Sequence, residues 1–168
     1  MIETRNEEET RALGAAVGEA SEPGDIILLR GHFGAGKTTF VQGLARGLGI
    51  SDQVTSPSFV IACEYEGRVP LYHIDLWRVE QMDATTLEAL AEYFGGDGVC
   101  AVEWPDSVPM DLIQEAVRID ITPTGDDQRS LSLDGAPPRL REVFERGAGV
   151  RKAVRGGAGA GRRNAPRD

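Results

Sequence analysis

The stretch GHFGAGKT, residues 31–38, decides the fold of this chain. It satisfies the pattern G-x-x-x-x-G-K-[ST], in which a glycine-rich loop turns its backbone N–H groups toward phosphates. The apolar run at 26–29 predicts a buried strand before the loop, and Phe40, Leu44 and Leu48 follow it at four-residue spacing. A strand, this loop and a helix in that order predict a P-loop site for a nucleoside triphosphate.

Each residue type in the loop has a physical task. The glycines adopt backbone angles closed to other residues and carry no Cβ, so successive N–H groups converge on an anion. The Lys37 ammonium offsets charge that develops on a transferred phosphoryl group, and the Thr38 hydroxyl is a hard oxygen suited to Mg²⁺. We therefore predict that nucleotide and Mg²⁺ bind here. The expected phosphate-binding residues are Gly34, Ala35, Gly36, Lys37, Thr38 and Thr39.

Two carboxylates compete for the metal and for the attacking water. Asp75 follows residues 71–74, and Glu103 follows residues 99–102, a smoother apolar run of the kind expected beside a P-loop strand. We favour Glu103 as the metal ligand, directly or through water, with Asp75 orienting water or the metal's hydration shell. For Asp75 an ion pair with Arg78 is the open alternative.

Three further features have a functional and a plain interpretation. The hydroxyls of residues 55–58 fit a segment that senses the γ-phosphate, and they fit an ordinary Ser-Pro turn equally well. Trp104 fits stacking on a base, anchoring of a partner, or simple packing beside Pro105. His73 alternates with apolar neighbours, so we interpret it as a structural histidine.

The remaining pattern predicts an α/β fold, a single small P-loop NTPase domain. Its sheet is mixed and mainly parallel, flanked by helices, and includes an antiparallel hairpin with its turn at residues 66–67. The predicted helices lie around residues 13–20, 38–48 and 87–94, and the further strands at 54–61, 64–75, 99–102, 116–121 and 130–133.

Length and charge limit how the chain can act. At 168 residues it has no room for a nucleotide domain and a separate substrate domain, so we expect a macromolecular substrate to be handled with partners. We assign 1–148 to the P-loop ATPase domain and 149–168 to a basic Gly/Ala/Arg-rich disordered tail. The tail carries a net charge of +5 and the rest −14, within a total of −9. Strong direct binding of nucleic acid by the acidic part is therefore not expected, while the tail either touches RNA weakly or only solvates the chain.

The sequence also predicts a compartment. No segment reaches the apolar length of a membrane span, and acidic residues rather than a basic leader follow Met1. We expect a cytoplasmic protein with no membrane association. Cys63 and Cys100 lack metal-ligand spacing and are expected to be buried free thiols.

Five motifs in order resemble the TsaE family, the bacterial P-loop ATPases of tRNA threonylcarbamoyladenosine biosynthesis. They are Glu9-Thr10, the loop 31–39, Ser56-Pro57-Ser58-Phe59, His73-Ile74-Asp75-Leu76-Trp77-Arg78 and Glu103-Trp104-Pro105. The resemblance covers residues 3–133, and the intervals make the set far more specific than the P-loop alone. Two positions depart from the usual family pattern: Ser58 replaces Thr, and Trp77 replaces Tyr.

The resemblance implies an ATPase that supports a complex of TsaB- and TsaD-like proteins, which transfers a threonylcarbamoyl group to the adenosine beside the tRNA anticodon. This chain would not itself be the transferase, and it would meet tRNA only through the complex. Thr10 would lie near the nucleotide, Thr38 and Glu103 would hold Mg²⁺, and Asp75 would serve hydrolysis. Trp104 becomes a functional aromatic residue that contacts either nucleotide or partner.

The expectation is thus a slow, Mg²⁺-dependent ATPase that is a monomer when free. Two other classes stay open on the sequence. A small-molecule kinase would use the same loop, although no arginine-rich lid is evident. A nucleotide-responsive binding module would bind the same ligand without significant hydrolysis.

Overall fold

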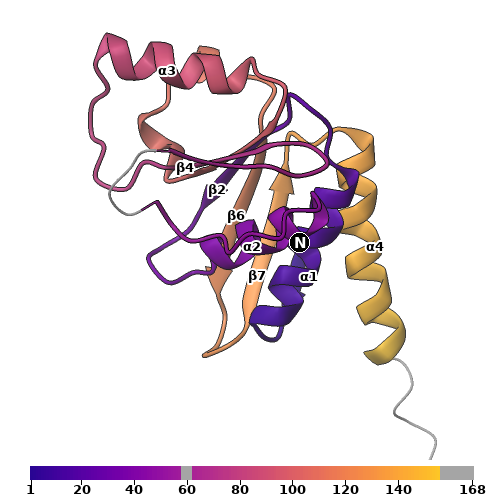
Figure 1. The fold of residues 1–168 in the computed structure, drawn as a ribbon. Helices are drawn as coiled ribbons and strands as arrows, with labels where there is room; N and C mark the ends of the chain where they lie inside the picture. The colour runs from indigo at the N-terminus through magenta and orange to yellow at the C-terminus, as the bar shows by residue number, and fades with distance from the viewer. Residues whose placement is uncertain (58–61, 156–168) are drawn as a thin grey trace, which may run out of the picture.

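The computed structural model describes residues 1–57 and 62–155, which form one seven-stranded sheet with helices on both faces (Figure 1). The strands run in the order β1-β7-β6-β2-β5-β4-β3. Their bounds are β1 Ile2–Thr4, β2 Ile26–Arg30, β3 Ala62–Tyr65, β4 Leu71–Asp75, β5 Val99–Glu103, β6 Val117–Pro123 and β7 Arg129–Asp134. The helices are α1 Glu7–Ala20, α2 Lys37–Gly47, α3 Ala84–Phe94 and α4 Pro138–Arg155.

The centre of the sheet is parallel and its edges are antiparallel. β6, β2, β5 and β4 pair in parallel, whereas β1 and β7 at one edge and β3 at the other pair antiparallel. β5 is buried along its whole length, as a parallel strand covered on both faces should be. In register, Glu103 faces Leu29 of β2 on one side and Asp75 of β4 on the other. The carboxyl ends of these strands therefore meet at one edge, where ligands of open α/β sheets bind.

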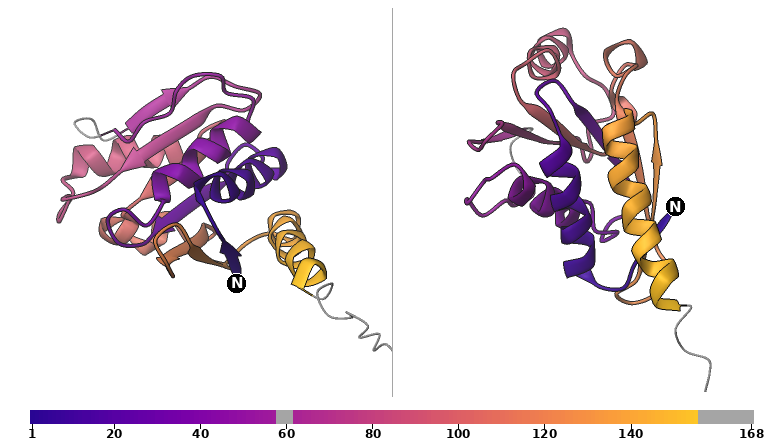
Figure 2. Two further views of the ribbon diagram at one scale, coloured as in Figure 1. Left: turned by 90° about the horizontal axis from the view of Figure 1, so that it is seen from below. Right: turned by 90° about the vertical axis from the view of Figure 1, so that its right-hand side faces the viewer.

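Alternate residues of each central strand supply two cores. Ile27 and Leu29 pack with α1, α2 and α4, whereas Leu28 between them packs with α3 and the turns that follow β5. Figure 2 shows α1, α2 and α4 on one face of the sheet and α3 on the other. Successive side chains of β2 point to opposite faces of the sheet, which explains why helices cover both faces.

Helices α1 and α2 pack at unusually short distance because glycines line their contact. A Cβ on Gly14 would lie 2.3 Å from the carbonyl oxygen of Phe40, and one on Gly43 would lie 2.1 Å from that of Arg11. Gly18 and Gly47 repeat the arrangement one turn further along. This approach holds the start of α1 beside the helix that follows the P-loop.

Most predicted elements are confirmed, but β1 is not among them, and two further regions differ. Residues 54–57, expected to begin the hairpin, form no strand, because Pro57 lacks the N–H that a β-ladder needs. Strand β3 begins at Ala62, and residues 58–61 lie outside the described part. Helix α4 was not predicted. Pro138 occupies its first position, where proline is favoured, and Leu140 and Phe144 bury against the core.

The predicted domain boundary at residue 148 falls inside α4, which continues to Arg155. The prediction for the rest of the tail concerns residues 156–168, outside the described part, and stays a prediction. Across residues 1–57 and 62–155 no helix is long and apolar enough to cross a bilayer.

Gly43→Ala should destabilise the protein by about 1–3 kcal/mol, because the new methyl group meets the backbone oxygen of Arg11 and the two helices must separate. Gly95→Ala is the matched control. Its Cβ would sit 3.5 Å from the nearest atom at a negative φ, so its stability should be unchanged or rise by up to about 1 kcal/mol. Urea unfolding monitored by circular dichroism measures both, and equal midpoints would refute the close contact.

Candidate functional site

A cleft of about 770 Å³ opens at the carboxyl edge of the central strands. Its walls come from the P-loop, residues 56–57, the residues that end and follow β4, and the pair Glu103-Trp104 at the end of β5. Glu7 at the start of α1 contributes the far rim. This size lies within the range of small-molecule and cofactor sites. The cleft therefore has room for one nucleotide.

The P-loop takes its shape from glycines with positive φ. Gly31, Gly34 and Gly36 have φ of 151°, 74° and 106°, in a region that side chains with a Cβ rarely adopt. Of the predicted phosphate-binding residues, Gly34, Gly36, Lys37, Thr38 and Thr39 line the cleft.

Ala35 belongs to the same predicted set, and its binding of phosphate through the backbone stays a prediction. Its side chain is buried, it does not line the cleft, and its N–H donates to the carbonyl of His32 at 3.0 Å. Its own carbonyl accepts a hydrogen bond from Arg129 Nε at 2.8 Å. Ala35 thus shapes the loop from beneath, and Arg129 ties that loop to the β6–β7 hairpin.

The Lys37 ammonium lies at the centre of the loop. Nζ donates to the carbonyls of Gly31 at 2.8 Å and His32 at 3.0 Å, and it sits 3.9 Å from the ring centroid of Trp104. Burial lowers the pKa of this ammonium below its usual value, against the opposing effect of the Glu103 and Asp75 carboxylates. A partly desolvated cation attracts phosphate oxygens more strongly than one in bulk water.

Glu103 joins the P-loop to the sheet. Its side chain is buried, and its Oε1 accepts hydrogen bonds from Thr38 Oγ1 at 2.9 Å and from His73 Nε2 at 2.8 Å. Residues 65 positions apart in sequence thus bring a hydroxyl and a carboxylate together at the base of the cleft. Both are hard oxygen donors, and the pair fits Mg²⁺.

Asp75 is held by two donors beside that pair. Its Oδ2 accepts from Ser56 Oγ at 2.6 Å and its Oδ1 from the N–H of Trp77 at 2.9 Å. An ion pair of Asp75 with Arg78 is not among those formed within the described chain. The carboxylate instead connects β4 to the predicted sensing segment. Of that segment, Ser58 lies outside the described residues.

Three aromatic side chains stand at the mouth of the cleft. The rings of Trp104 and Trp77 are 4.4 Å apart between centroids, and Phe33 at the tip of the P-loop lies 6.2 Å from Trp77. Phe33 is 83% exposed and Trp77 45%, so both offer apolar surface to solvent. Trp104 has a left-handed backbone with φ 57° and ψ 56°, a conformation that is uncommon for non-glycine residues and recurs at functional sites.

Thr10, which the family resemblance places near the nucleotide, does not line the cleft. Its hydroxyl is 2.8 Å from that of Thr4 and 3.3 Å from the carbonyl of Asn6, and the residue is buried. It lies on the inner face of α1, where its hydroxyl forms a hydrogen bond with Thr4 of β1. Glu7, one turn earlier, lines the cleft instead. Nothing in the run of glutamates at 7–9 distinguishes this residue in the sequence.

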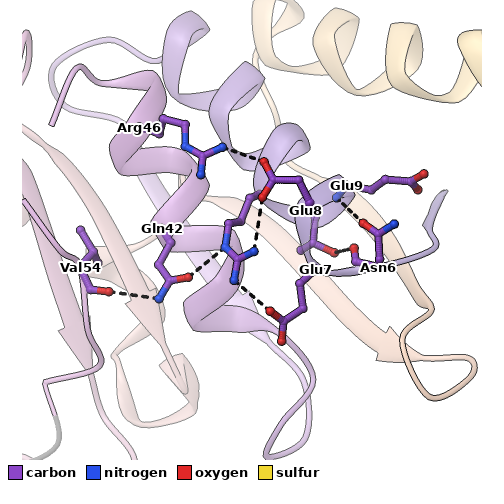
Figure 3. A network of polar contacts seen from close by, with 9 residues as sticks. Asn6, Glu7, Glu8, Glu9, Gln42, Arg46 and Val54 are labelled. Atoms are coloured by element: carbon purple, nitrogen blue, oxygen red, sulfur yellow. Dashed lines mark hydrogen bonds and ion pairs between the residues drawn. The ribbon is translucent and has the colours of Figure 1, made fainter. Parts of the chain in front are cut away.

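A polar network links α1, α2 and the segment before Ser56 (Figure 3). Arg11 donates through Nε to Gln42 Oε1 at 3.2 Å and through its terminal nitrogen to Glu7 Oε2 at 2.9 Å. Gln42 in turn donates to the carbonyl of Val54 at 3.2 Å. Exposed ion pairs of this kind add little stability, but the chain of contacts fixes both rims of the cleft relative to α2.

Comparisons with known proteins agree with this geometry. The sequence model of the family described as "Threonylcarbamoyl adenosine biosynthesis protein TsaE" matches residues 4–131. The chain is 43% identical over 143 residues to the Bacillus subtilis tRNA threonylcarbamoyladenosine biosynthesis protein TsaE, covering 84% of this chain and 89% of the relative. It is 36% identical over 130 residues to the Treponema pallidum protein of the same name, covering 77% and 96%.

A solved structure described as the crystal structure of Bacillus subtilis YdiB superposes with a TM-score of 0.71 at 38% identity. The superposition covers 90% of this chain and 98% of that one. The family match runs from the last residue of β1 into β7 and includes every residue that lines the cleft. The chain belongs to the TsaE family.

Proposed function

We propose that this chain is a Mg²⁺-dependent ATPase that supports threonylcarbamoyladenosine modification of tRNA. The observation that carries the ATPase part is the hydrogen bond between Thr38 and Glu103 beneath the P-loop. It brings two oxygen donors for one hard cation beside the place where the loop cradles phosphates. The tRNA part follows from the names of the relatives, since several proteins named for this biosynthesis match most of the chain.

Each residue has a separate task in the proposed reaction. The loop N–H groups bind the β- and γ-phosphates, and Lys37 exchanges contacts with loop carbonyls for contacts with phosphate oxygens. Thr38 and Glu103 would hold Mg²⁺, which neutralises charge on the phosphates when bound. Asp75, already fixed by Ser56 and the Trp77 N–H, accepts a hydrogen bond from the attacking water and aligns it with the γ-phosphorus.

The transfer to tRNA is proposed to occur on other proteins. Residues 1–148 carry a net charge of −14, which opposes a direct grip on phosphate backbones, so we assign the contact with tRNA to TsaB- and TsaD-like partners. The chain would act with them in the cytoplasm, as a monomer when free. Trp104 contacts Lys37 and the exposed Trp77, so it would relate the state of the nucleotide to the surface that a partner meets.

Removing the charges at the base of the cleft should separate binding from hydrolysis. We expect Lys37→Ala to lower phosphate release by about 10²-fold or more, because the phosphates lose their buried cation. Glu103→Gln should bind nucleotide as well as wild type without metal, but Mg²⁺ should no longer increase its affinity for the nucleotide. Asp75→Asn should keep the stronger binding with Mg²⁺ and lower turnover by about 10²-fold, because a neutral amide is a weaker acceptor for the attacking water than a carboxylate.

These expectations are checked by phosphate release together with calorimetric binding of a non-hydrolysable ATP analogue, with and without Mg²⁺. Circular dichroism verifies that each variant is folded. Undiminished phosphate release in folded Lys37→Ala would refute catalysis at this site. If the wild-type chain binds nucleotide but releases no phosphate, alone or with partners, it is a binding module instead.

The tRNA role is tested in the source organism and with purified components. Deleting the gene should remove threonylcarbamoyladenosine from tRNA, measured by mass spectrometry of digested nucleosides, and wild-type but not Lys37→Ala should restore it. Phosphate release should rise when TsaB- and TsaD-like proteins and tRNA are added. Normal levels of the modified nucleoside in the deletion strain would contradict the proposal.

A further inference from the structure

We propose that His73 is a positioning residue for the metal site: its Nε2–H fixes the Glu103 carboxylate in the orientation that Mg²⁺ needs. The inference rests on the proposed function, since it concerns the same carboxylate. His73 was expected from the sequence to be merely structural. In the folded chain it is completely buried, and its Nε2 lies 2.8 Å from Glu103 Oε1.

The strand register brings the two residues together. His73 and Asp75 are two positions apart on β4 and therefore point to the same face of the sheet, the face that α2 covers. His73 pairs directly with Ala101, so Glu103 is its diagonal neighbour on β5, within reach of a long side chain. A histidine at this position reaches the carboxylate from beneath, on the side away from the cleft.

The tautomer follows from the surroundings of the ring. Nδ1 is buried and has no hydrogen-bond partner within the described chain. A proton on Nδ1 would leave a buried donor unpaired and would turn a lone pair toward the carboxylate. The proton therefore belongs on Nε2, where it is donated to Glu103.

Two donors from different elements then hold one oxygen. Thr38 approaches Oε1 from the P-loop helix and His73 approaches it from β4, so rotation of the carboxylate breaks at least one bond. A hydroxyl that donates its proton to Glu103 still has lone pairs for a cation. Outer partners that orient a metal ligand in this way typically change metal affinity by 10–100-fold when they are lost.

His73→Gln and His73→Asn form a matched pair that differs by one methylene group. The amide nitrogen of glutamine reaches the position of Nε2, whereas that of asparagine corresponds to Nδ1 and falls short of Glu103. With a non-hydrolysable ATP analogue bound, Mn²⁺ affinity measured by electron paramagnetic resonance should fall about 10–100-fold in His73→Asn and stay within about threefold of wild type in His73→Gln. Binding of the analogue without metal should be equal in all three proteins.

Several results would overturn this role. They are unchanged Mn²⁺ affinity in His73→Asn, an equal loss in both variants, or a loss of metal-free analogue binding as large as the loss of Mn²⁺ binding. The last would assign His73 to the general structure of the fold. Failure of the wild-type chain to bind Mn²⁺ with the analogue would instead refute the proposed function.

A measurement on the wild-type chain covers the case in which the variants do not fold. The chain has two histidines, and the other, His32, is exposed on the P-loop, so their ring signals are readily separated in long-range ¹H–¹⁵N spectra. We expect His73 to carry its proton on Nε2, and this resonance to shift when Mg²⁺ is added to the analogue-bound chain. A proton on Nδ1 alone would overturn the proposal, and so would a resonance that does not shift in a chain that binds Mn²⁺ with the analogue.

Discussion

The site depends on the parallel register of β2, β5 and β4. Because Glu103 pairs with Leu29 on one side and Asp75 on the other, the strand that leads into the P-loop and both carboxylates end at the same edge. A slip of one residue would turn Glu103 toward α3 and bring Val102, now buried on that side, to the face of α2. The apolar runs that bury β5 on both faces therefore also determine which side chains meet the nucleotide.

Burial strengthens the electrostatic interactions of the charged groups in the site. Lys37, Glu103 and Asp75 lie where solvent is partly excluded, and burial outweighs the two carboxylates in setting the pKa of Lys37. The ammonium is stabilised by two loop carbonyls and the face of Trp104, so its contacts extend to the aromatic cluster at the surface. On the other flank, the glycine contact of α1 with α2 and the Arg11–Gln42 bond hold the rim carrying Glu7.

The sequence predicts the parts of the structure where local physical requirements explain the choice of residue. The P-loop glycines need positive φ, and the apolar run before Glu103 marks a buried strand, so the loop, the central strands and the placement of Thr38 with Glu103 were predictable. The bond between the hydroxyls of Thr10 and Thr4 and the bond from Arg129 to the Ala35 carbonyl could not be predicted, because each depends on an element that packs beside the residue only in the folded chain. His73 was interpreted only as a structural histidine, because its partner Glu103 is 30 residues away on another strand.

The central claim is that Thr38 and Glu103 hold the cation that serves the bound nucleotide. A crystal structure with a non-hydrolysable ATP analogue and Mn²⁺, with the metal located by its anomalous signal, tests it most directly. The account predicts one Mn²⁺ beside the phosphates, coordinated by Thr38 Oγ1 and contacted by Glu103 directly or through one water. A Mn²⁺ bound elsewhere, or phosphates that lie outside the loop of residues 31–38, would contradict it.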